Sequence, residues 1–245
     1  MRKIAAVTFD LWDTLVQEYP EGSDKVAKAR IEGIRRVLGE LGLEHSRDEL
    51  TKAYAKTGDF LDLTWSKRRD MSVRDQVLFL LSSVDDKLAG KLKTSEIEAV
   101  EKVYCDGIFE MPPRLLPGAK DSLKSAKSRG YKVGLISNTG RTPGTTLRVL
   151  MEQMGILQYF DATTFSNEIM VRKPAETAFK VTLEKLRVQP KVSVHIGDDP
   201  DKDVAGAKQV GMRAIQVVRD GARKSLSADL HIRTLDGVVD RIDSL

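Results

Sequence analysis

The sequence has a single cysteine, Cys105, among 245 residues. One cysteine excludes an internal disulfide and a metal site built from several thiolates. Aromatic residues make up only 6% of the chain, and no apolar run approaches the roughly 20 residues that cross a bilayer. Asp10 and Asp13 interrupt the apolar stretch near the start, and no small-residue cleavage site follows. We therefore expect no signal peptide and a cytoplasmic protein.

The charge of the chain is mixed, with 40 basic residues, 36 acidic residues and a net charge of +4. This balance suits an anionic small molecule, and it also suits nucleic acid. The basic residues are scattered, however, and the short cluster Lys67-Arg68-Arg69 lacks interleaved aromatic residues. This cluster and the nearby Trp65 either reach the substrate or form a solvated helix end, and we favour the helix end. We expect no nucleic acid and no membrane as partner, and the sequence leaves monomer and homodimer open.

The order of the expected elements indicates an α/β fold. Residues 3–9 are a compact apolar run that ends at an aspartate, which is typical of a buried parallel strand. After Pro117, helices expected at 118–129, 143–154, 175–187 and 201–210 alternate with strands at 131–136, 161–165, 192–196, 213–218 and 228–232. Such alternation predicts a doubly wound, Rossmann-like parallel sheet with helices on both faces.

A helical segment separates the first strand from the rest of this core. Ser23 or Asp24 is expected to cap its first helix, and further helices are expected at 47–58, 73–82 and 95–109. No stretch between residues 18 and 112 has the pattern of a strand. We therefore predict an α/β catalytic core of residues 1–16 and 114–245, and an inserted all-helical cap domain of residues 17–113.

Polar residues follow three of the expected strands. Asp10 follows the first strand, Ser137 and Asn138 follow 131–136, and Asp198 and Asp199 follow 192–196. In an open α/β sheet, ligands bind beyond the carboxyl ends of the strands. A carboxylate fixed there can attack phosphorus and form an acyl phosphate. Bound Mg²⁺ would offset the repulsion between such carboxylates and an anionic substrate.

Each of these residues has an expected task in this chemistry. Asp10 and Asp198 supply metal ligands, while Asp203 or Asp199 steadies metal-bound water from further out. Asp199 has a second interpretation as a helix cap. Lys173, just before a proline at a helix start, adds positive charge where the transferred group is most negative.

Two strand-end residues and one residue within a strand complete these expectations. Ser137 and the amides that follow it, including that of Asn138, are expected to hold phosphate oxygens by hydrogen bonding. His195 lies within an apolar strand, and we interpret it as a core residue with its polar atoms satisfied.

Four segments, in this order, resemble the motifs of the haloacid dehalogenase superfamily: Phe9-Asp10-x-x-x-Thr14-Leu15, Ser137 at a strand end, Lys173-Pro174, and Gly197-Asp198-x-x-x-x-Asp203. The helical insertion resembles the C1-type cap of that family. The resemblance implies that Asp10 is the nucleophile and that Ser137 and Lys173 contact the phosphate. It also implies that Asp198 and the main-chain carbonyl of Trp12 bind Mg²⁺.

One position departs from the phosphatases of that family. They usually carry a second aspartate two residues after the nucleophile, as general acid and base, whereas this chain has Trp12. Trp12 is either a hydrophobic wall of the substrate site or part of the packing at the cap junction, and we favour the wall. Asp13 is either a replacement acid or a turn residue, and the alternation of side chains favours the turn. General acid–base help contributes about 10²–10⁴ in rate, so its loss predicts a slow phosphatase or one that needs a good leaving group.

Three functions therefore remain open. The favoured one is a Mg²⁺-dependent phosphatase that acts on a small phosphorylated molecule through an aspartyl phosphate on Asp10. The first alternative is a metal-independent 2-haloacid dehalogenase, because those relatives also carry an aromatic residue at that position; they lack the acidic cluster of Asp198, Asp199 and Asp203. The second is a catalytically weak module that binds a phosphorylated ligand or a protein, and retention of the nucleophile together with Lys173 argues against it.

Overall fold

The computed structural model describes residues 4–242 and residue 245. Six strands form one parallel sheet in the order β5-β4-β1-β6-β7-β8. The strands are Ala6–Phe9 (β1), Lys132–Ser137 (β4), Ala162–Phe165 (β5), Ser193–Gly197 (β6), Arg213–Val217 (β7) and Leu230–Ile232 (β8). The chain extends the sheet from β1 through β4 and β5 on one side, and from β6 through β8 on the other. The predicted doubly wound α/β fold is confirmed, and β1 lies where the strand order reverses.

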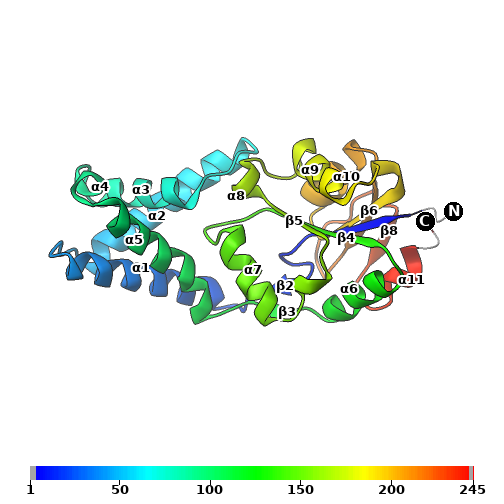
Figure 1. Cartoon of the computed structure of the whole chain (residues 1–245), viewed down its shortest axis with the longest axis horizontal. Helices are drawn as coiled ribbons and strands as arrows, with labels where there is room; N and C mark the ends of the chain where they lie inside the picture. Colours follow the sequence, from blue (N-terminus) through cyan, green and yellow to red (C-terminus); the bar gives the residue numbers. More distant parts are fainter. Residues whose placement is uncertain (1–3, 243–244) are drawn as a thin grey trace.

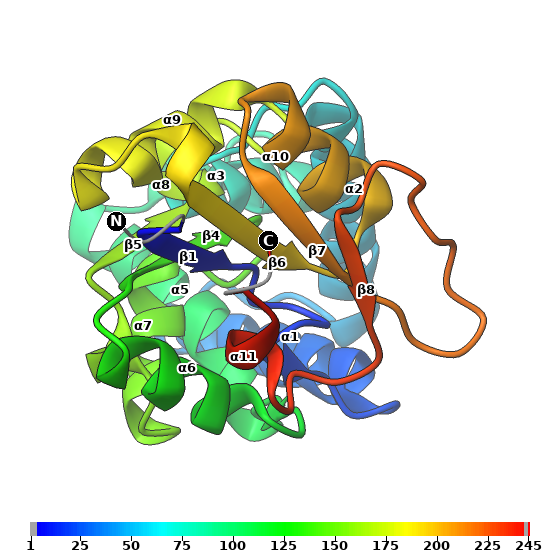
Figure 2. The ribbon, with the colours of Figure 1, turned by 90° about the vertical axis from the view of Figure 1, so that its right-hand side faces the viewer.

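Helices cover both faces of this sheet (Figure 2). On one face lie α9 (Glu176–Leu186) and α10 (Gly206–Gln209), and on the other lie α6 (Ala119–Ser128), α7 (Gly144–Gln153) and α11 (Val238–Ile242). The whole of β1 is buried because its side chains alternate between these layers. Phe9 packs in the cluster that includes Leu123 of α6, whereas Ala6 packs with Leu186 of α9.

A helical insertion lies between β2 (Val16–Gln17) and β3 (Arg114–Leu115), and it stands apart from the sheet in Figure 1. It contains α1 (Gly22–Glu40), α2 (Arg47–Ser66), α3 (Val73–Val84), α4 (Leu88–Lys91), α5 (Thr94–Asp106) and the 3-10 turn η1 (Gly107–Glu110). These helices have their own apolar cluster, with Leu38, Leu81 and Tyr104 fully buried in it. Because β2 and β3 pair antiparallel, the two connections to the core lie side by side. The division of the chain at residues 17 and 113 stays a prediction.

Several boundaries differ from those expected. The first strand begins at Ala6, and Lys3 lies outside the described residues. The prediction that Ser23 or Asp24 caps α1 is wrong, because the helix begins at Gly22, before both residues. The second helix runs on to Ser66, and a reciprocal pair of hydrogen bonds between Ser46 and Glu49 caps its start.

The remaining short elements lie in the core: α8 (Ser166–Ile169), the 3-10 turns η2 (Leu157–Tyr159) and η3 (Pro190–Val192), and the π-helical turn η4 (Pro200–Ala205). None of the helices in the described part of the chain combines the length and apolar character that a membrane span requires.

Candidate active site

Asp10 lies at the carboxyl end of β1, in the middle of the sheet. Its main-chain N–H donates to the carbonyl of Ile196 on β6 at 2.9 Å, which fixes the end of the strand. Its side chain is buried, and Oδ1 lies 2.5 Å from Nζ of Lys173. The predicted nucleophile and the predicted phosphate-binding lysine are thus in direct contact.

Lys173 is held at both its side chain and its main chain. Its Nζ donates to Asp10, to Asp203 Oδ1 at 2.6 Å and to the carbonyl of Ile136 at 2.7 Å, which uses all three ammonium hydrogens. Asn138 Oδ1 accepts from the main-chain N–H of Lys173 at 2.8 Å, and Asn138 Nδ2 donates to its carbonyl at 3.1 Å. The Asn138 side chain therefore positions Lys173, a task that the sequence did not suggest.

Asp203 is also held at both carboxylate oxygens. Besides the contact with Lys173, Oδ1 lies 3.1 Å from Nε2 of the buried His195, and Oδ2 accepts from the main-chain N–H of Asp199 at 3.0 Å. The other ring nitrogen of His195 lies 2.8 Å from Oγ1 of Thr8 on β1. Burial lowers the pKa of His195, against the opposing hydrogen bond and charge of Asp203. His195 is a core residue as expected, and its contact with Asp203 was missed.

Asp203 reaches the site because the chain turns tightly after β6. The Asp199 side chain accepts from the main-chain N–H groups of Asp201 and Lys202, at 2.9 and 2.8 Å, and so caps η4. The helix expected over 201–210 is this π-helical turn followed by α10. A Cβ at Gly197 would lie 2.3 Å from the Asp203 carboxyl carbon, so only glycine allows this approach. The capping interpretation of Asp199 is confirmed.

Three carboxylates converge here: oxygen atoms of Asp10, Asp198 and Asp203 lie within 4.8 Å of one another. Burial raises the pKa of Asp10 to about 8. The positive charge of Lys173 opposes this rise, and the negative charges of Asp203 and Asp198 add to it. Burial, followed by the charge of Asp203, raises the pKa of Asp198 to about 6. Burial alone would also raise the pKa of Asp203. The charges and hydrogen bonds of Lys173 and His195 outweigh burial and hold the pKa of Asp203 well below the usual range.

This cluster suits a small divalent cation. Carboxylate oxygens are the ligands that Mg²⁺ prefers. A cation between Asp10 and Asp198 would favour the charged form of both acids, against the burial and the nearby negative charges that raise their pKa values. The Asp203 oxygens already accept from protein donors, so this residue is better suited to hold Lys173 in place. The donor set therefore fits Mg²⁺, with two acids available to it.

A cavity of 210 Å³ opens over the cluster, and Trp12 and Asp13 line it together with the three acids. Asp13 has a left-handed backbone (φ 56°), and its exposed carboxylate pairs with Arg219 at 3.1 Å. Ser137 is buried at the end of β4, where its Oγ donates to the carbonyl of Asn138 at 3.3 Å.

A second cavity of 340 Å³ lies between the core and the helical insertion, and Trp12, Asn138 and Arg172 line both cavities. Trp65 lines this second cavity and stacks on Arg172, whose guanidinium carbon lies 4.4 Å from the ring centroid. The expectation of a solvated helix end is therefore wrong for Trp65. The basic cluster of residues 67–69 is exposed, as expected.

Asp70 anchors the end of α2 to the core. Its side chain is buried, and Oδ2 accepts from Arg172 at 2.9 Å, from Thr139 at 3.2 Å and from Ser166. Its Oδ1 accepts from Nε1 of Trp65 at 3.1 Å. One buried carboxylate thus joins the insertion to two loops of the core, and it fixes Arg172 and Trp65 at the wall of the second cavity.

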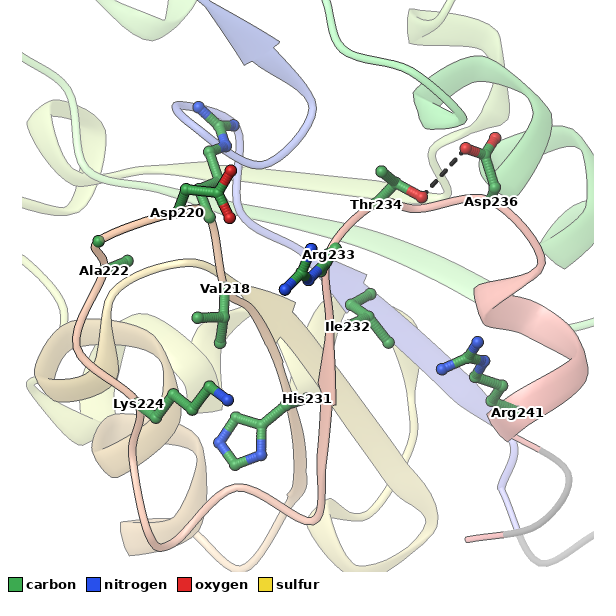
Figure 3. Close-up of a pocket in the computed structure, with 12 residues that line it drawn as sticks. Val218, Asp220, Ala222, Lys224, His231, Ile232, Arg233, Thr234, Asp236 and Arg241 are labelled. Carbon is green, nitrogen blue, oxygen red and sulfur yellow. Dashed lines mark hydrogen bonds between the residues drawn. The ribbon is translucent and has the colours of Figure 1, made fainter.

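A larger cavity of 540 Å³ lies at the outer edge of the sheet beside β8 (Figure 3). It is lined by basic residues such as Lys224 and Arg233 and by Asp236, which accepts from Thr234 at 3.0 Å. Among the described residues that line it, none is a predicted site residue. The volume of a cavity therefore does not identify the candidate active site, whereas the convergence of the three carboxylates and Lys173 does.

The comparisons with known proteins agree with the four motifs. The family model described as haloacid dehalogenase-like hydrolase matches residues 4–211. Haloacid dehalogenase-like hydrolase domain-containing protein 3 of Mus musculus is 27% identical, over 86% of this chain and 80% of that protein. Glyceraldehyde 3-phosphate phosphatase of Methanocaldococcus jannaschii is also 27% identical, over 99% of this chain and 98% of its own length.

Two solved structures resemble the fold along almost its whole length. A HAD phosphatase from Thermococcus onnurineus has 26% sequence identity and a TM-score of 0.62, and the match covers 98% of each chain. A 2-haloacid dehalogenase from Pseudomonas syringae pv. Tomato DC3000 has a TM-score of 0.67 over 97% of each chain; at 22% identity, it supports the fold alone. Since the family model spans most of the sequence, the chain belongs to the haloacid dehalogenase-like hydrolases.

Proposed function

We propose that this hydrolase removes phosphate from a small phosphate monoester, with Asp10 as the nucleophile and Mg²⁺ as the cofactor. The observation that carries the proposal is the position of Lys173, whose Nζ lies 2.5 Å from Asp10 and 2.6 Å from Asp203, with Asp198 beside them. A fixed cation and converging carboxylates at one edge of the sheet suit an anionic group that gains charge during its transfer.

In the first step, a carboxylate oxygen of Asp10 attacks phosphorus while the bond from phosphorus to the alcohol oxygen breaks. The alcohol leaves with the bonding electrons and takes a proton from water, and Lys173 offsets the charge on the phosphate. Asp10, Asp198 and the Trp12 carbonyl would hold Mg²⁺, which supplies the positive charge that lets a phosphate approach two acids. Ser137 and the main-chain amide of Asn138 would bind phosphate oxygens, whereas the Thr139 N–H already donates to Ser166 Oγ at 2.7 Å.

In the second step, water attacks the phosphorus of the aspartyl phosphate. The bond from phosphorus to the Asp10 oxygen breaks, inorganic phosphate leaves and the carboxylate is restored. We assign Asp13 to the turn and not to proton transfer, because it pairs with Arg219 and has a left-handed backbone. Solvent then takes both tasks of the second aspartate found in other phosphatases of the family: it gives a proton to the leaving alcohol in the first step and accepts one from the attacking water in the second.

Two observations favour a phosphate ester over a haloacid as substrate. Three carboxylates within 4.8 Å of one another would repel the carboxylate of a haloacid unless a cation were bound. The relative from Methanocaldococcus jannaschii, which aligns along almost the whole chain, is named a phosphatase.

A panel of phosphate esters, including glyceraldehyde 3-phosphate and p-nitrophenyl phosphate, tests the proposal in Mg²⁺ and in chelator. We expect phosphate release in Mg²⁺, none in chelator, and none from Asp10→Asn. Chloride release from 2-chloropropionate that persists in chelator, without phosphate release, would favour the dehalogenase. Binding of phosphate esters without release from any of them would favour the binding module.

A further inference from the structure

Arg30 of α1 is a buried cation beside the second cavity. Its side chain is 5% exposed and its three nitrogens donate to neutral oxygens: the Tyr104 carbonyl at 2.7 Å, the Tyr54 hydroxyl at 3.2 Å and Thr142 Oγ1 at 2.6 Å. None of these partners carries a negative charge. Burying a charge without a counter-charge is costly.

Arg141 brings a second cation to the same wall from the core loop after β4. Its guanidinium donates to the Tyr104 hydroxyl at 3.3 Å and to the Tyr54 carbonyl at 3.0 Å, and its carbon lies 3.8 Å from the Tyr54 ring centroid. Among the described residues, neither Arg141 nor Arg30 forms an ion pair, whereas Arg172 pairs with Asp70. A guanidinium has five N–H groups, so both arginines keep donors beyond these contacts.

The position of this pair relates it to the phosphate site. The cavity that Arg30 and Arg141 line adjoins the one over Asp10, because Trp12 and Asn138 belong to both walls. Glu18 is the one acid among the described residues that line the second cavity, and its side chain is exposed. Burial raises the pKa of Glu18 and the charge of Arg30 opposes that rise, but the two side chains do not form an ion pair. Two guanidiniums without an ion-pair partner among the described residues therefore face the space that the rest of a bound phosphate ester would fill.

We propose that the substrate carries a second anionic group, a carboxylate or a second phosphate, and that Arg30 and Arg141 bind it. The proposal rests on the phosphatase activity proposed above and adds the class of ester. A guanidinium forms strong, charge-assisted hydrogen bonds with either anion, and such a bond in a desolvated cavity is worth about tenfold or more in affinity.

Two matched pairs of esters separate the sources of the anion. 3-Phosphoglycerate differs from glycerol 3-phosphate by a carboxylate, and fructose 1,6-bisphosphate differs from fructose 6-phosphate by a second phosphate. In Mg²⁺, we expect kcat/KM to be at least about tenfold higher for the more anionic member of one pair. Equal kcat/KM within both pairs would refute the second-anion site and leave the phosphatase intact. Absence of phosphate release from these four esters and from the panel described above would refute the phosphatase itself.

Variants then locate the site. In Arg141→Met, the two esters of the pair that shows a preference should have nearly equal kcat/KM. Arg141→Lys should keep part of the preference for the more anionic ester. Arg35→Met is the matched control, because Arg35 lies on α1 with Arg30 but is exposed and paired with Glu32 at 2.6 Å. If Arg141 only fastens the insertion to the core, its loss would slow both members of the pair equally and the preference would remain.

A binding measurement makes the test independent of turnover. Titration of Asp10→Asn with 3-phosphoglycerate, glycerol 3-phosphate and the two fructose phosphates, by calorimetry, should show the same preference as the kinetics. Equal affinities within both pairs would contradict the proposal even if no ester is hydrolysed by the wild type.

Discussion

Asn138 and Lys173 lie 35 positions apart, and the side-chain amide of the first bonds both main-chain polar groups of the second, at 2.8 and 3.1 Å. The loop after β4 therefore fixes the main chain of Lys173, and Asp10 and Asp203 fix its ammonium group. We expect Asn138→Leu to leave both main-chain groups without a partner and to cost about 1–3 kcal/mol of stability. Because the Lys173 ammonium would no longer be held beside Asp10, kcat should fall by about tenfold or more.

Thermal denaturation and steady-state kinetics check this prediction together. Asn167→Leu is a suitable control, because that side chain accepts a single hydrogen bond, from the Gly144 N–H at 3.1 Å, away from Lys173. The control should lose some stability and keep its kcat. A loss of kcat of similar size in both variants would indicate a general loosening of the core.

The acid cluster predicts an unusual dependence of stability on pH. The pKa of Asp10 is about 8 in the folded protein and 3.8 in an unfolded chain. Between these values the folded state binds more protons, so stability falls as pH rises. His195 acts in the opposite direction below its ordinary pKa of 6.5, and Asp198 titrates near 6, so the window from pH 6.5 to 8 isolates Asp10.

In chelator, we expect the free energy of unfolding to fall across this window, by at most about 1.4 kcal/mol per pH unit for one group. Mg²⁺ should raise stability most at pH 8, because the cation competes with the proton for Asp10. Denaturant melts with and without Mg²⁺ would measure both effects, and Asp10→Asn should flatten the slope. A stability that rises from pH 6.5 to 8 in chelator would contradict the assignment of the pKa.

The strand ends of this site were predictable because they depend on local pattern. A short apolar run that stops at an aspartate is visible in residues 3–10, and each of the other two strands ends in polar residues in the same way. The order of these elements was enough to bring Asp10, Asp198 and Lys173 to one edge of the sheet. The roles assigned to these residues still await experiment.

The contacts between the insertion and the core could not be predicted in this way. Asp70 follows a run of exposed basic residues and has the local character of a solvated loop, yet it is buried because two core loops close over it. Arg141 reaches Tyr54 and Tyr104 across the same junction, 87 and 37 positions away in sequence. His195 meets Asp203 only because a π-helical turn follows β6. The hydrophobic periodicity of a single helix or strand does not predict such contacts between elements.

Asp70 provides a direct test of this junction. Asp70→Ala would leave Arg172 without its carboxylate and Thr139 and Ser166 without their acceptor. Breaking a buried ion pair from one side costs about 3–5 kcal/mol. Asp48→Ala removes an exposed pair with Lys52 and should change stability by about 1 kcal/mol or less. Similar losses in the two variants, measured by urea denaturation, would show that the Asp70 network contributes little.

Trp12 determines how the rate depends on the leaving group. With no general acid beside the alcohol oxygen, the wild type should hydrolyse p-nitrophenyl phosphate, whose leaving group needs no proton at neutral pH, at least about 10² faster in kcat than glycerol 3-phosphate. Trp12→Asp supplies a carboxyl two residues after Asp10 and should narrow this ratio by raising kcat for the alkyl ester. Trp12→Ala opens the same space without an acid and should leave the ratio unchanged. If the wild type already shows similar kcat values for both esters, another group protonates the alcohol, and Asp13 would have to be reconsidered as that acid.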